Sequence, residues 1–264
     1  MRTLIIIFGC LALASTGFSA PIAYELNVNT TIYRVNAANN NEIFYGNAPF
    51  TSDSLALSPA GTLYSADANG VLWNITAAPI PVGPTGFTQI GDLDWANNGL
   101  WGFSNPSSSL FFFDLGLNTV TYSASITGLG AATITGVAYD STTSDIYLSG
   151  NTGLNTDQLF RIPFSTNAAI TIGSMPISDA FSYIADIDFD GASGNLYAMS
   201  FFHRDFYSVN TSNGATTFLS TGPHRDTTAM ALDAVPEPTT LVLALFGMGA
   251  LALSRRSRAK RDAA

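Results

Sequence analysis

Hydrophobic and polar residues alternate with a period of two through much of the chain between Tyr24 and Asp233. This period is that of a half-buried β-strand, because successive side chains of a strand point to opposite faces of its sheet. The alternating stretches are separated by polar turns that contain Asn-Gly, Asp-Gly and Ser-Gly pairs. No window shows a sustained helical period, so the pattern predicts an all-β domain.

A four-residue word of apolar, aromatic, polar and aliphatic character recurs in this region, and its copies begin 40, 40, 47 and 47 residues apart. The copies are Ile32–Val35, Leu72–Ile75, Phe112–Leu115, Leu159–Ile162 and Phe206–Val209. Two further strand-like words precede each of the last four copies, and another strand-like stretch follows each word. Four strands in 40–50 residues are typical of a β-propeller blade.

The ends of the repeat region predict how the ring of blades closes. Residues 31–35 and 42–45, together with 24–28, supply late strands, whereas Met230-Ala231-Leu232 resembles a first strand without the rest of its repeat. The two ends would then share one composite blade. We therefore expect five four-stranded blades over residues 24–234. A two-sheet β-sandwich with irregular hairpins is the alternative fold.

Residues 1–20 have the features of a secretory signal peptide. Arg2 provides the positive start, Leu4–Ala14 an apolar run, and Ser15–Ala20 a stretch of mostly small residues for cleavage. The only cysteine, Cys10, lies inside the apolar run. The mature chain is therefore expected to contain neither a disulfide nor a cysteine-bound metal.

The C-terminal residues 235–264 combine three features in order. The motif Pro236, Glu237, Pro238 comes first, and the apolar run Thr239–Leu253 follows it as a predicted transmembrane helix. A basic cluster that would stop transfer and stay on the cytoplasmic side comes last, and it contains Arg255, Arg256, Arg258, Lys260 and Arg261. This order predicts that the body of the protein lies outside the inner membrane.

These three features resemble the PEP-CTERM sorting signal of Gram-negative bacteria. The resemblance implies that the chain is a substrate of an exosortase, a membrane cysteine transpeptidase that processes proteins near the Pro-Glu-Pro motif. It also implies an association with exopolysaccharide and biofilm formation. A plain C-terminal anchor with a chance Pro-Glu-Pro is the alternative.

The charge of the repeat region argues against one class of partner. Between Tyr24 and Val235 the chain has four arginines and no lysine, against 17 acidic residues. A surface of this charge repels phosphates, so we expect no direct binding to nucleic acid.

One acidic motif suggests a metal site. Asp186, Asp188 and Asp190 occupy every second position, so that in a strand they would share one face and offer oxygen ligands to Ca²⁺. Asp92 and Asp94 have a similar register in their own repeat, which favours an architectural role instead. Calcium is the only cofactor that the sequence suggests.

Other chemistry-bearing residues form no recognisable catalytic constellation. The triplets His203-Arg204-Asp205 and His224-Arg225-Asp226 are expected to be exposed loop residues near a blade edge. The aromatic residues that could stack on sugars recur at the repeat period and are expected in the blade core. They are Trp73, Trp95, Trp101 and Tyr197. No nucleophile elbow, zinc-protease motif or phosphate loop is present.

The sequence thus predicts an exported, non-enzymatic surface or extracellular-matrix protein that contacts exopolysaccharide or other surface proteins. It would be anchored transiently by its C-terminal helix until the exosortase processes it. The alternative is a secreted propeller enzyme acting on polysaccharide, as a lyase or glycosidase, and that function would need two carboxylates converging on one face.

Overall fold

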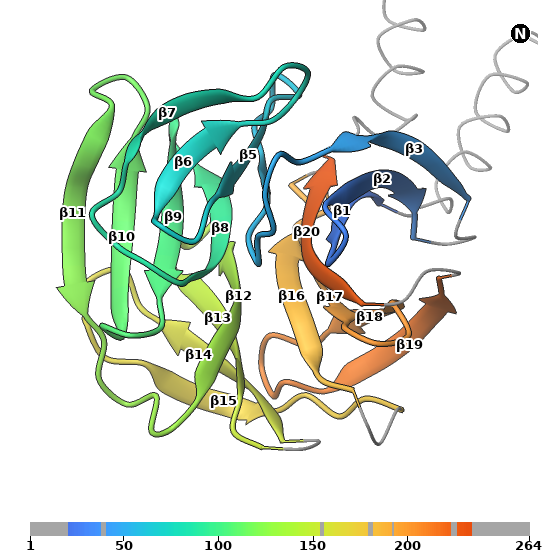
Figure 1. Ribbon diagram of the computed structural model, residues 1–264. Coiled ribbons are helices and arrows are strands. Elements are labelled where there is room, and N and C mark those ends of the chain that lie inside the picture. Colours follow the sequence, from blue (N-terminus) through green and yellow to red (C-terminus); the bar gives the residue numbers. More distant parts are fainter. Residues whose placement is uncertain are drawn as a thin grey trace, which may run out of the picture. The chain divides into compact units, whose positions relative to one another are not determined.

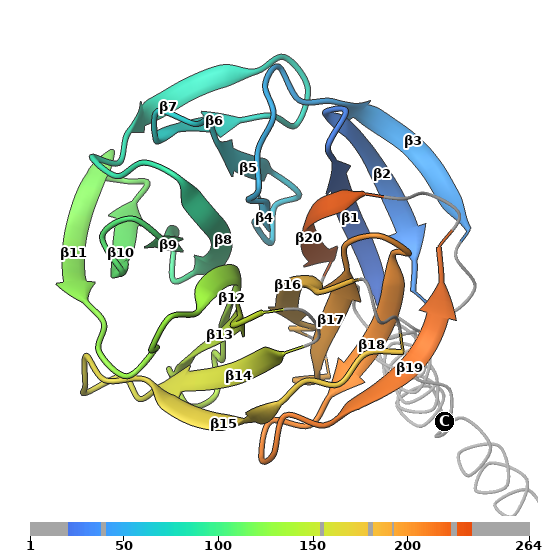
Figure 2. The same cartoon turned by 60° about the horizontal axis from the view of Figure 1, so that its bottom comes forward.

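The computed structural model describes residues 21–37, 41–153, 156–178, 182–191, 193–222 and 226–233, all within the compact unit Pro21–Ala234. Over these residues twenty strands form five four-stranded antiparallel sheets. The sheets stand as blades around a common axis (Figures 1 and 2). The predicted all-β, five-bladed propeller is confirmed.

We number the blades in the order in which their outermost strands occur along the chain. The strands of each blade are listed from the axis outward. Blade 1 contains β20 (Thr227–Asp233), β1 (Ile22–Asn27), β2 (Thr31–Asn36) and β3 (Glu42–Asn47). Blade 2 contains β4 (Ala56–Leu57), β5 (Leu63–Ala66), β6 (Val71–Asn74) and β7 (Ile80–Pro84). Blade 3 contains β8 (Ile90–Ala96), β9 (Gly99–Ser104), β10 (Ser109–Asp114) and β11 (Thr119–Ser125).

The last two blades follow the same order. Blade 4 contains β12 (Thr133–Tyr139), β13 (Ile146–Asn151), β14 (Asp157–Ile162) and β15 (Ile170–Ser174). Blade 5 contains β16 (Ile184–Phe189), β17 (Leu196–Ser200), β18 (Asp205–Val209) and β19 (Thr216–Thr221). Strands β4, β8, β12, β16 and β20 surround the axis (Figure 2).

Blade 1 closes the ring with strands from both ends of the repeat region. β20 pairs antiparallel with β1, with Ala23 opposite Leu232 and Glu25 opposite Met230. The predicted composite blade is therefore confirmed. β1 begins at Ile22 and β20 ends at Asp233, so closure of the ring joins segments that are about 200 residues apart in the sequence.

The repeated sequence words occupy equivalent places in every blade. All five copies of the four-residue word begin in the third strand of their blade, and the words that precede them form the first and second strands. The third strand of each blade is an interior strand with another strand on either side.

Hydrophobic side chains fill each seam between neighbouring blades. Between blades 3 and 4, for example, Phe103 and Leu110 lie in one buried cluster with Val137 and Leu148. Burying each such side chain contributes roughly 1.5–3 kcal/mol. Four further clusters of described residues occupy the other four seams. The blades therefore hold one another through their faces, as expected for sheets that cannot bury both faces alone.

Gly136 marks a place where two inner strands approach closely. A Cβ at this position would lie 2.6 Å from the backbone nitrogen of Ile187 and 3.0 Å from the Cα of Asp186. We expect Gly136→Ala to push β12 and β16 apart and to lower the free energy of unfolding by about 1–3 kcal/mol. Urea denaturation would measure this. Gly61→Ala is an informative comparison. Gly61 has open space around its Cβ position but a φ of +79°. Any loss of stability in Gly61→Ala therefore comes from backbone strain alone.

The remaining predictions of chain organisation fall outside the described residues. They include the signal peptide at 1–20 and the apolar helix within 235–264. In the parts of the chain that the structure describes, no helix has the length and apolar character needed to span a membrane.

Candidate functional site

Acidic residues converge on the propeller axis from two inner strands. Asp92 and Asp94 lie on β8, and Asp186 and Asp188 lie on β16. In both strands the pairing register shifts immediately before the first of the two aspartates. A β-bulge of this kind changes the direction of the side chains that follow it. Here those side chains belong to the aspartates, which point toward a neighbouring blade.

Each aspartate accepts hydrogen bonds from the inner strand of the next blade. Asp92 Oδ2 accepts the backbone N–H of Val137 at 2.7 Å, and Asp94 Oδ2 accepts that of Tyr139 at 2.5 Å. Asp186 Oδ2 and Asp188 Oδ2 do the same for β20, accepting the N–H groups of Met230 and Leu232, at 2.6 and 2.7 Å respectively. The four side chains thus satisfy backbone donors at the inner edges of β12 and β20, which have no strand partner there.

The same carboxyl groups are buried and close to one another. Asp92 and Asp186 are 1% and 0% exposed, and Asp94 and Asp188 are each 8% exposed. The carboxyl group of Asp186 interacts with that of Asp92 and raises the pKa of Asp92, which favours its protonated form. We refer to these four residues as the axial carboxyl cluster.

Burial determines the protonation of the axial carboxyl cluster. It raises the pKa of Asp92, Asp186 and Asp188 well above the usual range, and the charge of Asp186 raises that of Asp92 further. Burial raises the pKa of Asp94 to about 7, although the N–H groups of Tyr139 and Trp95 oppose the shift. Because carboxyls this buried are not accessible to a polymer, the cluster does not supply the converging catalytic pair of a polysaccharide-cleaving enzyme.

The predicted calcium ligands are divided between two places in the fold. Asp186 and Asp188 belong to the axial carboxyl cluster, whereas Asp190 lies in the turn after β16, where its Oδ2 accepts the hydroxyl of Ser193 at 2.6 Å. Over the described residues, no group of three or more Asp, Glu, His or Cys side chains is arranged to hold a metal ion. Calcium binding by these three residues stays a prediction.

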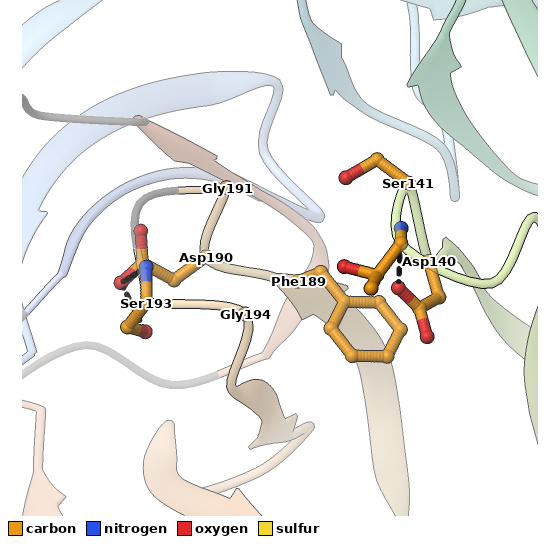
Figure 3. A pocket seen from close by; sticks show the side chains of 8 residues that line it. Asp140, Ser141, Phe189, Asp190, Gly191, Ser193 and Gly194 are labelled. Atoms are coloured by element: carbon orange, nitrogen blue, oxygen red, sulfur yellow. Dashed lines mark hydrogen bonds between the residues drawn. The ribbon is translucent and has the colours of Figure 1, made fainter.

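The turn that contains Asp190 borders a small hollow on the surface. The hollow has a volume of about 220 Å³ and lies between the β12–β13 turn of blade 4 and the β16–β17 turn of blade 5. Its lining residues are Asp140, Ser141, Thr142, Phe189, Asp190, Gly191, Ser193 and Gly194. Figure 3 shows the ring of Phe189 between the two turns, with Asp140 on one side and Asp190 on the other. We call this site the blade 4–5 hollow.

Hydrogen bonds inside each turn fix both carboxylates of the hollow. Asp140 Oδ1 accepts the N–H of Thr142 at 2.8 Å, and its Oδ2 accepts the hydroxyl of Thr143 at 2.7 Å. The turns also share a backbone pattern, since Ser144 donates to the carbonyl of Asp140 and Gly194 to that of Asp190, each at 2.7 Å. This site was not predicted, because nothing in the repeat period indicates that two turns of adjacent blades face each other.

Arg204 corrects the expectation for the first His-Arg-Asp triplet. We expected exposed loop residues, but Arg204 is 0% exposed and Asp205 is buried at the start of β18, while His203 alone is exposed. Arg204 Nε lies 2.8 Å from Glu25 Oε2, and Arg204 Nη1 lies 2.9 Å from Glu42 Oε2. The triplet is therefore part of the contact between blade 5 and blade 1. Of the second triplet, His224 and Arg225 lie outside the described residues.

The aromatic residues that could have bound sugars pack against the blades, as expected. Trp101 packs at a tilt against Phe112 and edge-to-face against Tyr122, and Tyr64 packs against Trp95 with ring centroids 6.1 Å apart. Trp73 and Tyr197 lie against buried clusters in two other seams. None of these four side chains lines the blade 4–5 hollow.

Comparison with solved structures supports the fold alone. A chain in the crystal structure of a nidogen/laminin complex is similar with a TM-score of 0.51, over 80% of this chain and 84% of that chain. The two sequences are 9% identical, so the likeness does not extend to function. No curated protein matches the sequence.

The residues predicted from the sequence to direct sorting lie beyond the described part of the chain. They are Pro236, Glu237 and Pro238 together with the basic cluster that ends at Arg261. The PEP-CTERM protein-sorting motif matches residues 234–259. This protein is thus a five-bladed β-propeller that carries a PEP-CTERM sorting motif directly after its closing strand.

Proposed function

We propose that this chain is exported, processed by an exosortase near Pro236-Glu237-Pro238, and retained at the cell surface or in the extracellular matrix. There the propeller serves as a structural or binding protein that contacts exopolysaccharide. The sorting motif supports export and processing, and it suggests the cell envelope or surface as the destination.

The position of the motif relative to the fold is the observation that carries this proposal. β20 ends at Asp233, and the motif begins at residue 234. Cleavage near the Pro-Glu-Pro segment therefore removes no strand from blade 1, and the ring stays closed. At the other end β1 begins at Ile22, so removal of a signal peptide spanning residues 1–20 also leaves the blade complete.

A variant of the basic cluster tests the processing step. Replacing all five of its Arg and Lys residues by Gln removes the charges that would hold the C-terminus in the cytoplasm. We expect the amount of processed protein at the cell surface to fall by about tenfold or more, as measured by immunoblotting of cell fractions with an antibody to the propeller. The residues replaced are Arg255, Arg256, Arg258, Lys260 and Arg261.

A charge-conserving variant provides the control. Replacing the four arginines of the cluster by lysine keeps every positive charge and should leave surface delivery unchanged. Normal delivery of the Gln variant would refute the proposed role of the cluster.

A further inference from the structure

We infer that the blade 4–5 hollow binds one amino-sugar residue of a polysaccharide. This inference rests on the proposed surface function and assigns it a site and a class of ligand. It is based on a difference between two seams of the propeller, on the groups that line the hollow, and on its size.

The difference between the seams concerns one aromatic position. Tyr139 and Phe189 are both the last residue of an inner strand, and they pair with the first residue of the next strand in the same register. At the seam between blades 3 and 4, the Tyr139 hydroxyl accepts a hydrogen bond from Asn97 Nδ2 at 3.0 Å and lies 3.4 Å from Ser144 Oγ. That hydroxyl therefore joins the two turns of its seam.

Phe189 has no hydroxyl group with which to join the turns of the next seam. The turn contributed by blade 3 is also short, with Asn97 and Asn98 at positive φ, whereas blade 4 contributes the longer turn between Asp140 and Asp145. The blade 4–5 hollow lies at this seam, and Phe189 is one of its lining residues (Figure 3). The repeat therefore differs between the two seams in its aromatic residue and in its turns.

The lining suits a sugar that carries a positive charge. Asp140 and Asp190 are two acidic groups, and no Lys, Arg or His is among the lining residues. A carboxylate can accept about four hydrogen bonds, so Asp140, which accepts two within its turn, can also bind a ligand ammonium or hydroxyl group. Ser141 adds a hydroxyl group, and the ring of Phe189 provides an apolar wall for the C–H face of a pyranose.

The size of the hollow limits the ligand to a single ring. Its volume of about 220 Å³ lies below the roughly 300–1,000 Å³ of pockets that enclose drug-sized ligands. The remaining rings of a polysaccharide would lie outside. An anionic uronic acid would be repelled by the same two aspartates, so the hollow should discriminate among sugars by charge.

Titration calorimetry with three tetrasaccharides of equal length tests this inference. The probes are the tetramers of glucosamine, N-acetylglucosamine and galacturonic acid, each titrated into the full-length chain in detergent micelles with EDTA present. We expect the glucosamine tetramer to bind at least about tenfold more tightly than the N-acetylated one, because it alone carries ammonium groups. The galacturonic acid tetramer should not bind, and added salt should weaken glucosamine binding.

Phe189→Tyr is the decisive variant because it adds a hydroxyl group to a side chain that lines the hollow and keeps every charge of the protein. We expect it to weaken glucosamine binding by about tenfold or more while the melting temperature stays close to that of the wild type. Nonspecific attraction between a cationic sugar and an acidic domain would be unaffected by this change. Asp140→Asn, which can keep the hydrogen bond from Thr142, should also weaken binding.

The equivalent change at the neighbouring seam is the matched control. Tyr139→Phe removes the corresponding hydroxyl between blades 3 and 4 and should leave binding unchanged. Equal binding by Phe189→Tyr and the wild type, equal binding of the two glucosamine-based tetramers, or no binding in EDTA would each overturn the inference. Surface delivery of Phe189→Tyr should remain normal, so a delivery defect would count against the proposed function and not against this site.

Discussion

Replacing Arg204 by methionine is expected to lower the free energy of unfolding by about 3–5 kcal/mol. The guanidinium group is 0% exposed and lies against Glu25 on β1 and Glu42 on β3. Methionine retains much of the apolar volume but leaves the carboxyl group of Glu25, itself 2% exposed, without the guanidinium group that lies 2.8 Å from its Oε2. Equilibrium unfolding in urea, followed by tryptophan fluorescence, would measure the loss.

The expected loss is large because of where the contact lies. Arg204 belongs to the connection between β17 and β18 of blade 5, and its two partners belong to the N-terminal strands of blade 1. The contact therefore holds the composite blade against its neighbour at the place where the ring closes. Methionine is preferable to glycine for this test, because Arg204 has a φ of 52° and glycine would relieve that backbone strain as well.

Arg161 offers a matched control for the Arg204 experiment. Its Nε lies 3.7 Å from Asp145 Oδ2, and the side chain of Arg161 is 39% exposed. Ion pairs of this kind contribute roughly 0–1 kcal/mol, so Arg161→Met should change stability by less than about 1 kcal/mol. If both variants lost the same small amount, the buried contact would have no special role in closure.

A second large effect is expected from pH, and its direction is unusual for an acidic protein. We expect the free energy of unfolding to fall by about 4 kcal/mol or more as the pH rises from about 4 to about 8. Burial raises the pKa of Asp157 to about 6, that of Asp94 to about 7 and that of Glu25 to about 8. For Glu25 the charge of Arg204 opposes this increase without cancelling it.

The sign of the effect follows from proton binding. A raised pKa means that the folded chain binds the proton more tightly than the unfolded chain does. The resulting stabilisation is complete below the unfolded pKa of about 4, and it is lost as the pH rises through the folded pKa values. Asp92, Asp186 and Asp188 act in the same direction. Thermal unfolding measured at half-unit pH intervals would show the trend.

Asp92→Asn isolates the axial contribution to this pH dependence. The amide oxygen can still accept the N–H of Val137, and the amide nitrogen can donate to Asp186. We expect the variant to match the wild type near pH 5 and to be more stable at pH 8. Asp114→Asn, at the end of β10 and outside the axial carboxyl cluster, is the control, and an equal effect of both variants would contradict the account.

The repeat explains why most of the fold could be predicted from the sequence. Apolar positions recur in the third strand of each blade, and Met230-Ala231-Leu232 matches the word of the first strand. The blade count and the composite blade therefore followed from the pattern alone. The same comparison placed Asp92 and Asp94 in register with Asp186 and Asp188. It could not show that these side chains meet, because strand periodicity gives the face of a residue but not the blade that it contacts.

The features that could not be predicted from the sequence depend on contacts between blades. Arg204 was expected to be exposed because its neighbours in sequence are polar and it follows a strand. Its burial depends on Glu25 and Glu42, which are more than 150 residues away in the chain. The blade 4–5 hollow likewise lies between turns of two adjacent blades, which the folded ring brings together.

The central claim is that the propeller is delivered through processing of its C-terminal motif, and the mass of the mature chain tests it most directly. The protein would be recovered from the surface or surroundings of its native host and analysed by intact-protein mass spectrometry. The account predicts a chain that contains all of β20 and ends near Pro236-Glu237-Pro238, without the apolar run and the basic cluster. Material from outside the cell that still carried residues 239–264 would contradict it.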